Sequence, residues 1–251
     1  MPGLYKAEVL VIREREYGEA DKLLTLYSPS RGKIGAIAKG VRRLHSTLRP
    51  CAQLFVHSDV VLYAGQNLHT LTQGRMRESF DGIAADWERF RAAEYLAELV
   101  DAFIPSEEAD PRAFTLLLTC LRQLNSGVVD AELVLRWFEI RFLSQLGYQP
   151  RLQACAYCGQ GLEGQSQPVV FSPQLGGVLC SQCAPQDPAA MAISAGSVAV
   201  LHHFLMVPLA KLERLKLSVG LRKELGAALA RYIEVRLEKR LKSPRLLAHK
   251  S

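Results

Sequence analysis

"RGKIGAIAKGVRRLHSTLRP", residues 31–50, begins with a pattern that is typical of a half-buried β-strand. Apolar residues recur at every second position from Ile34 to Ala38, while Lys33 and Lys39 belong to the opposite face. Because side chains of a strand alternate between its two faces, one face can join a core while the other presents both lysines. Gly40 ends the pattern, and the segment after it is predicted to be a basic loop.

Similar runs, short and rich in β-branched and apolar residues, occur five times in the first 80 residues. They are "AEVLVIRERE" (7–16), "KLLTLYS" (22–28), "KIGAIAK" (33–39), "LFVHSDVVLY" (54–63) and "LHTLTQGR" (68–75). The turn-forming segments "YGEAD", "SPSRG" and "YAGQN" separate several of them. Together they predict a small five-stranded OB-fold barrel over residues 1–80, a fold whose exposed strands and loops commonly bind oligonucleotides.

Carboxylates are absent between Asp21 and Asp59, although the whole chain has 25 Asp and Glu against 31 Lys and Arg. The net charge of +6 and the pI of about 9.1 suggest polyanionic partners. A groove that follows a nucleic-acid backbone needs flexible cations, and acids there would oppose the contact. We therefore predict phosphate contacts from Lys22, Arg31, Lys33, Lys39, Arg42, Arg43 and Arg49. The alternative, a solvated basic face, would predict interleaved carboxylates.

Several other residues of the barrel and helices are expected to pack in the core. Four aromatic residues could stack on bases but are expected inside instead: Tyr17, Tyr27, Phe55 and Tyr63. Cys51 and Cys120 lie in apolar surroundings, where a small buried residue is the usual role of a free cysteine.

After Phe80 apolar residues recur at intervals of three and four, which predicts helices. The predicted helical segments cover residues 86–104, 111–127, 131–147, 194–215 and 218–242. Charges interrupt every apolar run before the roughly 18 residues of a membrane span, and no export signal begins the chain. The predicted fold is thus α+β: a barrel over 1–80 and an α-helical domain over 81–251, in a cytoplasmic protein without membrane contact.

The last predicted helix has an apolar side and a side that becomes basic towards its end. The apolar side consists of Leu221, Leu225, Leu229, Tyr232, Ile233 and Leu237. The cations are Arg231, Arg236, Lys239, Arg240 and Lys242. Because cations are favourable at a helix C-terminus, we expect a helix packed on the bundle rather than a second DNA contact.

Two CxxC motifs form the most specific chemical signal in the chain. "CAYC" places Cys155 and Cys158 three residues apart, and "CSQC" does the same for Cys180 and Cys183. The separation of the pairs suits a β-hairpin, so four thiolates can converge tetrahedrally on one structural Zn²⁺. Disulfides are the alternative, but a cytosolic thiol pool would keep these cysteines reduced. We predict a closed zinc-ribbon-like module at about residues 150–187.

Signatures of common enzyme classes are missing or out of context. "GQGLEG" (159–164) matches GxGxxG, yet it lies between the cysteine pairs and does not open a helix after a strand. The sequence has no GxxxxGK[ST], no HExxH and no zinc-deaminase pattern. A zinc hydrolase would need an open metal position, which four thiolates do not leave. These observations favour a non-enzymatic protein with no catalytic residues.

Four segments together resemble the RecO family of bacterial recombination mediators along the whole chain. They are "YGEADKLLTLYSPSRGKIGAIAKGVRR", "STLRPCAQLFV", "LGYQPRLQACAYCGQ" and "FSPQLGGVLCSQC". Cys51 departs from the family pattern, in which a Phe is expected after the Pro. The resemblance implies an OB-fold, a helical domain with a Cys₄ zinc module, and a nucleoid-associated role in recombinational repair.

The resemblance also implies an activity and a set of partners. Such a protein binds single- and double-stranded DNA, anneals complementary strands and, with RecR, helps to load RecA onto DNA covered by single-strand-binding protein. The acidic C-terminal tail of single-strand-binding protein is an expected ligand. We expect it to dock in an apolar groove between helices, beside cations such as Arg122, Arg136 or Arg141. The alternative is an adaptor whose basic barrel docks acidic protein tails without direct DNA contact.

Overall fold

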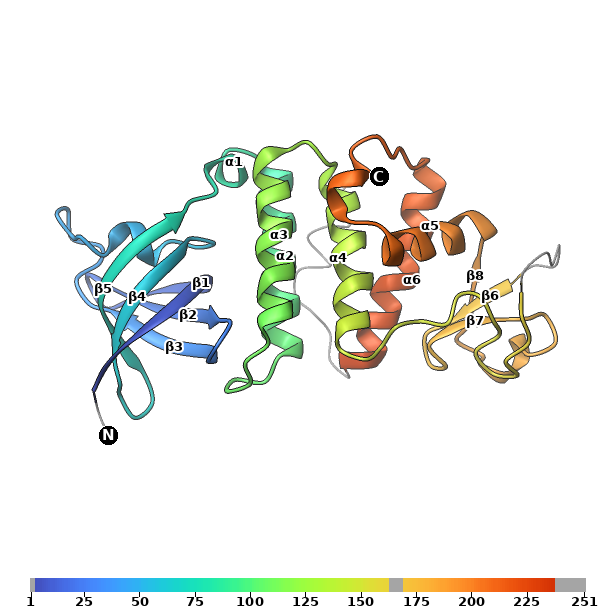
Figure 1. Ribbon diagram of the computed structural model, residues 1–251, viewed down its shortest axis with the longest axis horizontal. Coiled ribbons are helices and arrows are strands. Elements are labelled where there is room, and N and C mark those ends of the chain that lie inside the picture. The colour runs from blue at the N-terminus through green and yellow to red at the C-terminus, as the bar shows by residue number, and fades with distance from the viewer. Residues whose placement is uncertain (1–2, 163–168, 238–251) are drawn as a thin grey trace. The chain divides into compact units, whose positions relative to one another are not determined.

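The computed structural model describes residues 3–162 and 169–237 (Figure 1). The chain divides into two compact units, Met1–Ser126 and Gly127–Ser251. The first unit contains the predicted barrel together with three helices, and the second contains the remaining helices and both cysteine pairs. The predicted domain boundary near residue 80 separates these three helices from the barrel, and it stays a prediction.

The first unit begins with a closed five-stranded barrel, as predicted (Figure 1). Its strands are β1 (Leu4–Tyr17), β2 (Asp21–Ser28), β3 (Gly32–Ala38), β4 (His57–Tyr63) and β5 (His69–Glu78). They are hydrogen-bonded in the order β1-β2-β3-β5-β4, and β1 pairs with β4 to close the barrel. All pairs are antiparallel except that of β3 with β5.

Residues that alternate along a strand sequence lie on the inner and outer faces of this barrel. In β3, Ile34, Ala36 and Ala38 are buried in the barrel core, whereas the residues between them are half-buried. The short 3-10 helix η1 (Arg49–Ala52) adds Cys51, which is buried. Its sulfur lies only 2.7 Å from where a Cβ at Gly74 of β5 would fall. Cys51 is therefore a core residue, as predicted, packed against a strand position that has room for glycine alone.

Three helices complete the first unit: α1 (Asp81–Ala84), α2 (Trp87–Phe103) and α3 (Pro111–Ser126). The Asp86 carboxylate caps α2 by accepting hydrogen bonds from the first backbone N–H groups of the helix. The segment between α2 and α3 lies against the β2–β3 turn, because Tyr27 donates to the carbonyl oxygen of Asp110 at 3.1 Å. Gly32 in that turn has a φ of 67°, and a Cβ there would lie 2.6 Å from the Glu108 carbonyl oxygen.

The second unit contains the helices α4 (Ala131–Gln145), α5 (Ala195–Met206) and α6 (Val219–Leu237). The sequence pattern predicted one helical segment over 194–215, but α5 ends at Met206 and the 3-10 helix η3 (Leu209–Leu212) follows. Pro208 explains the interruption, because it lacks an N–H and restricts the residue before it.

Between α4 and α5 the chain forms a small three-stranded sheet. Its strands β6 (Val169–Ser172), β7 (Gly177–Leu179) and β8 (Met191–Ile193) are ordered β7-β6-β8, and the 3-10 helix η2 (Ala184–Gln186) follows the second cysteine pair. The fold class is therefore α+β, with a barrel, helices and an inserted cysteine module, as the sequence predicted.

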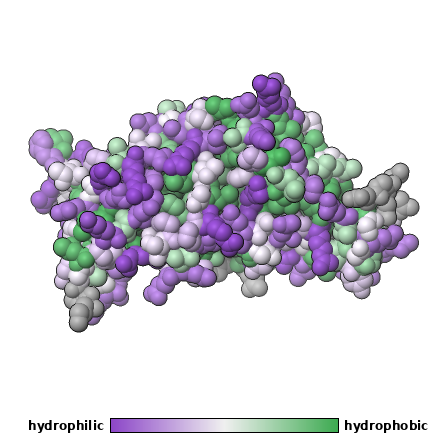
Figure 2. Space-filling model, in the orientation of Figure 1, coloured by the Kyte–Doolittle hydropathy of each residue, from purple (hydrophilic) through white to green (hydrophobic). Residues whose placement is uncertain are grey.

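None of the helices in the described part of the chain has the length and apolar character that crossing a membrane requires. On the face shown in Figure 2, hydrophilic and hydrophobic side chains are interspersed.

Candidate nucleic-acid interface and metal centre

Hydrogen bonds to backbone groups of the basic stretch after β3 hold it in place. Gly40, with a φ of 63°, turns the chain out of β3, and its N–H donates to the Asp21 carboxylate at 2.7 Å. The Arg42 N–H donates to the carbonyl oxygen of Ala20 at 2.9 Å, so the loop lies against the β1–β2 turn. Arg49 bonds the carbonyl oxygens of residues 42 and 43, each at 2.9 Å. We call residues 39–49 the basic loop.

Three cations of the basic loop, Lys39, Arg43 and Arg49, have no acidic partner among the residues that the structure describes. The side chains of Lys39 and Arg43 are exposed, and neither forms an ion pair with a residue that the structure describes. Arg42 pairs with Glu16 at 3.0 Å and also donates to the carbonyl oxygen of Glu19. Lys39 and Arg43 are thus available to an anion. Arg42 would bind one in competition with Glu16.

Two of the remaining predicted phosphate contacts, Lys22 and Lys33, are already bound by acids. Lys22 binds Glu14 at 2.8 Å, and 19% of its side chain is exposed. Lys33 binds Asp101 of α2 at 3.0 Å, and only 12% of its side chain is exposed. Arg31 lies over the ring of Tyr5, 4.4 Å from its centroid. Lys22 and Lys33 are thus paired and largely covered, whereas the side chain of Arg31 is exposed.

The acids that meet these cations were not apparent from the sequence. Glu14 and Glu16, the partners of Lys22 and Arg42, belong to the β1–β2 hairpin, which precedes the carboxylate-free stretch. The pairing of β1, β2 and β3 brings that hairpin beside the basic loop. The segment "REREYGEAD" contained the signal, because a hairpin next to β3 in the sheet must place its charges near those of β3.

Of the four aromatic residues considered for base stacking, two are buried and two are exposed. Tyr27 and Phe55 are buried, as expected, and burial strongly raises the pKa of the Tyr27 hydroxyl. Tyr17 and Tyr63 are instead 52% and 47% exposed. Each lies at the last position of its strand, where no neighbouring element covers it.

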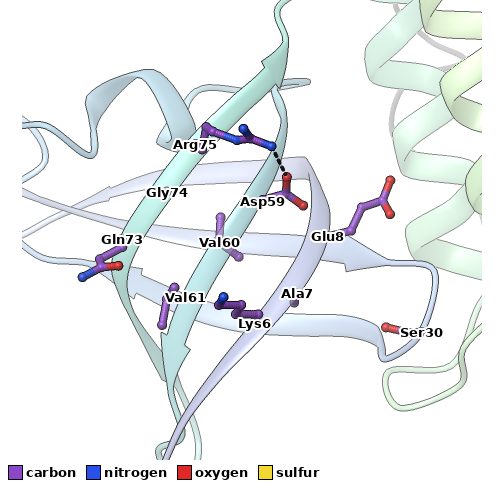
Figure 3. A pocket seen from close by; sticks show the side chains of 10 residues that line it. All are labelled: Lys6, Ala7, Glu8, Ser30, Asp59, Val60, Val61, Gln73, Gly74 and Arg75. Atoms are coloured by element: carbon purple, nitrogen blue, oxygen red, sulfur yellow. Dashed lines mark hydrogen bonds and ion pairs between the residues drawn. The ribbon is translucent and has the colours of Figure 1, made fainter.

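A shallow pocket of about 570 Å³ opens on the outer side of β1, β4 and β5 (Figure 3). Its cations are Lys6 and Arg75, and its acids are Glu8 and Asp59. A hydrogen bond from Arg77 to Asp59, at 2.8 Å, holds the pKa of that carboxyl below its usual value. Because the charges balance, the pocket does not select an anion.

The cations considered for an acidic tail all have partners within their own unit. Arg122 forms a hydrogen bond to Glu78 at 2.8 Å. Arg136 binds the fully buried Glu139 at 2.6 Å. Arg141 donates to the carbonyl oxygen of Val207 at 3.2 Å. A tail that bound any of them would have to compete with these contacts.

In the second unit, the two CxxC motifs bring their four sulfurs together. The Sγ atoms of Cys155, Cys158, Cys180 and Cys183 all lie within 4.8 Å of one another. Tetrahedral zinc with Zn–S bonds of about 2.3 Å would place its sulfurs about 3.8 Å apart, so a small contraction suffices. The donor set and its spacing therefore fit a four-coordinate zinc site.

Backbone hydrogen bonds shape the first CxxC pair for metal binding. Burial alone would raise the pKa of Cys155, but backbone N–H groups of Cys158, Cys180 and Tyr157 lower it to about 6. Gly159, with a φ of 76°, follows the pair and donates to the Cys155 carbonyl oxygen at 2.9 Å. The thiolate, which is the form that binds zinc, is therefore favoured at Cys155. At Cys183, burial and hydrogen bonds to the other three sulfurs instead raise the pKa to about 12.

Strand pairing connects the two cysteine pairs. Ala156 donates to the carbonyl oxygen of Val178 at 2.8 Å, which places the first pair beside the strand that leads to the second. A Cβ at Gly177 would lie 2.4 Å from the Arg151 carbonyl oxygen, so this close approach requires glycine.

The apolar side predicted for the last helix is buried at Leu225, Leu229, Tyr232 and Ile233 and half-buried at Leu221 and Leu237. Arg236 donates to the carbonyl oxygens of Pro173 and Gln174, each at 3.1 Å, and lies over the ring of Tyr232. It therefore binds α6 to the β6–β7 turn. The predicted cations Lys239, Arg240 and Lys242 lie outside the described residues.

Two family models together match nearly the whole chain. Residues 1–80 match the family model "Recombination protein O N terminal", and residues 84–245 match "Recombination protein O C terminal". The chain is 38% identical over 244 residues to the DNA repair protein RecO of Symbiobacterium thermophilum, covering 97% of this chain and 96% of that protein. It is 40% identical over 244 residues to the RecO of Desulfitobacterium hafniense strain Y51, covering 96% and 88% respectively. The chain therefore belongs to the RecO family of non-enzymatic DNA repair and recombination proteins.

Proposed function

We propose that this protein is a recombination mediator that binds single- and double-stranded DNA through the basic loop and anneals complementary strands. With RecR, it would help to load RecA onto DNA covered by single-strand-binding protein. The observation that carries the proposal is the pair of exposed cations Lys39 and Arg43, on a loop of an OB-fold barrel and without an acidic partner in the part of the chain that the structure describes. Family membership supports the link to DNA repair.

The chemistry of the proposed contact is charge neutralisation. Cations on the loop lower the repulsion between two phosphate backbones, so pairing of complementary strands needs no nucleotide hydrolysis. Arg42 and Arg49 add charge to the same loop, and Arg31 lies elsewhere on the barrel. The proposal leaves out Lys22 and Lys33, because Glu14 and Asp101 already bind them.

Salt dependence of oligonucleotide binding tests the proposal. Four loop cations on a single strand would give a slope of roughly −3 in a log-log plot of affinity against salt concentration. The variant Lys39→Glu/Arg43→Glu should weaken binding to all sequences equally, reduce the slope by about 1.4, and slow annealing. Lys216→Glu/Lys223→Glu is a matched control, since it makes the same charge change at exposed positions of the other unit.

The same titration distinguishes DNA binding from the adaptor alternative. An acidic peptide could occupy Lys39 and Arg43 by the same electrostatic attraction. If the protein binds such a peptide and the loop variant abolishes that binding while leaving DNA affinity and slope unchanged, the barrel is a protein-docking site. Equal effects of the loop variant and the control on DNA binding would also exclude the loop as the DNA site.

We further infer that the four cysteines hold one structural zinc ion. Four thiolates leave no open position on a tetrahedral metal, so the ion would stabilise the module rather than activate water. The close grouping of the four sulfurs supports this assignment.

A further inference from the structure

Two large apolar side chains are exposed beside the basic loop. Tyr17, at the end of β1, is 52% exposed, and Leu44, within the loop, is 78% exposed. Leu44 is flanked by the exposed side chains of Arg43 and His45. Single exposed apolar residues are common on protein surfaces and need no function. A binding role for Tyr17 and Leu44 therefore depends on whether they lie beside the cations of the basic loop.

The sheet register places Tyr17 on the side of the barrel where the loop lies. Tyr17 is directly opposite Asp21 in the β1–β2 ladder, and residues opposite each other project from the same face of a sheet. The Asp21 carboxylate accepts the Gly40 N–H, so this face points to the start of the basic loop. The bond between Arg42 and Ala20 then fixes the loop against the turn that follows Tyr17.

Phosphate contacts alone do not account for this arrangement. Lysine and arginine can follow a backbone without any apolar neighbour, and a duplex keeps the faces of its bases stacked inside. An unpaired strand exposes base faces next to its phosphates, and an aromatic ring beside cations suits both groups at once. An exposed leucine beside the ring adds apolar surface that an unpaired base can cover.

The nearby carboxylates do not remove the positive charge from this surface. Arg42 pairs with Glu16, whereas Asp21 accepts the Gly40 N–H and keeps its negative charge, as does the exposed Glu19. The loop has four cations, Lys39, Arg42, Arg43 and Arg49, against these three acids. Lys39 and Arg43 remain without an acidic partner among the described residues.

We propose that Tyr17 and Leu44 contact the bases of unpaired DNA and make the barrel prefer single strands to duplex. Tyr17 provides a stacking surface, Leu44 provides an apolar contact at the loop tip, and Lys39 and Arg43 bind the adjacent phosphates. This inference rests on the proposed DNA-binding function and specifies the kind of DNA that the loop selects.

Binding of the full-length protein to three labelled ligands of equal length tests this inference: oligothymidylate, an abasic strand and a duplex. Tyr17→Ala should weaken binding to oligothymidylate on the order of 5- to 100-fold, the usual effect of losing one base-stacking residue. Affinity for the abasic strand and the duplex should change less than about 2-fold, and the salt slope should stay the same, because no phosphate contact is lost.

Companion variants separate stacking from general effects. Tyr17→Phe should restore binding, since the ring remains, and Leu44→Ala should show the same selectivity as Tyr17→Ala with a smaller loss. Tyr63→Ala is the matched control, an exposed tyrosine at the end of a different strand, and it should bind all three ligands like the unaltered protein.

The outcomes distinguish this inference from the proposal on which it rests. If Lys39→Glu/Arg43→Glu weakens DNA binding but Tyr17→Ala and Leu44→Ala leave the preference for oligothymidylate over the abasic strand intact, the base-contact inference is wrong and the loop proposal stands. If Tyr17→Ala weakens all three ligands equally, its effect is not base contact, and the inference is again wrong. If the cation variant changes nothing, DNA binds elsewhere and both fail.

Discussion

Asp101 binds Lys33 through two of its oxygen atoms. The Lys33 ammonium lies 2.6 Å from the Asp101 carbonyl oxygen and 3.0 Å from Oδ1, and Arg13 lies 3.1 Å from Oδ2. A lysine from the stretch that looked most like a phosphate surface thus connects β3 to the last turn of α2. We expect its main contribution to be to stability.

Asp101→Ala should destabilise the protein by about 1–3 kcal/mol, because it removes a charged hydrogen bond from a lysine that is mostly buried. Thermal unfolding measured by circular dichroism gives the size of the effect, and Glu107→Gln at an exposed position is the control.

Because Asp101 already binds Lys33, Lys33→Met should leave the salt slope of DNA binding unchanged. A slope reduced by about 0.7 would instead show that Lys33 contacts phosphate.

The cysteine cluster should hold one zinc ion per chain. Cys158→Ser removes an exposed ligand, so the metal content measured by mass spectrometry should fall and the unfolding temperature should drop. The control variant Cys120→Ala alters a buried cysteine of the other unit, and its zinc content should equal that of the unaltered protein. Full zinc occupancy in Cys158→Ser would contradict the Cys₄ assignment.

Glu224 of α6 caps the start of α5 and should make stability depend on pH. Its Oε1 accepts the Ser194 N–H at 2.6 Å, and its Oε2 accepts hydrogen bonds from Ser194 and Ser197. Burial opposes ionisation, but these hydrogen bonds outweigh it and hold the pKa of Glu224 below its ordinary value. Since the folded-state pKa is depressed, the contribution is complete above the unfolded value of about 4.3 and is lost as the pH falls through the folded-state pKa.

Glu224→Gln should therefore cost about 1 kcal/mol at pH 7, the typical size of a cap, and progressively less below about pH 4. Urea unfolding of both proteins at each pH measures the difference. Glu234→Gln, in an exposed pair on the same helix, should cost less at every pH. A Glu224→Gln effect that stays constant down to pH 3 would mean that the charge of the cap is unimportant.

Arg236 should stabilise the cysteine module. Arg236→Ala removes two hydrogen bonds to the β6–β7 turn, so amide hydrogen exchange should become faster over residues 172–178. Arg236→Lys should restore only part of the protection, because an ammonium cannot reproduce the planar guanidinium over Tyr232.

The control is Arg231→Ala, which removes an exposed ion pair with Glu234 on the same helix. DNA affinity should be the same in all three variants. Loss of DNA binding in Arg236→Ala without faster exchange would assign this residue to a nucleic-acid contact instead.

The sequence alone was sufficient for features that depend on local pattern. Alternation over residues 33–39 predicted β3, and intervals of three and four predicted α2, α3, α4 and α6, because each element buries one face along its own length. The CxxC spacing identified the four cysteines whose sulfurs converge, since two residues between ligands turn both towards one point. The apolar pattern continues past Pro208, yet α5 ends at Met206, because a proline cannot donate the next backbone hydrogen bond of the helix.

Only the tertiary structure decided which of the predicted cations remain available. Glu14 and Glu16 reach Lys22 and Arg42 through strand pairing, and Asp101 reaches Lys33 from a helix 68 positions along the chain. An ion pair forms when two charged groups come within about 4 Å, and sequence separation does not reveal that distance. Exposure of Tyr17 but not Phe55 has the same origin, because a side chain is covered or left open by elements that its own segment does not specify.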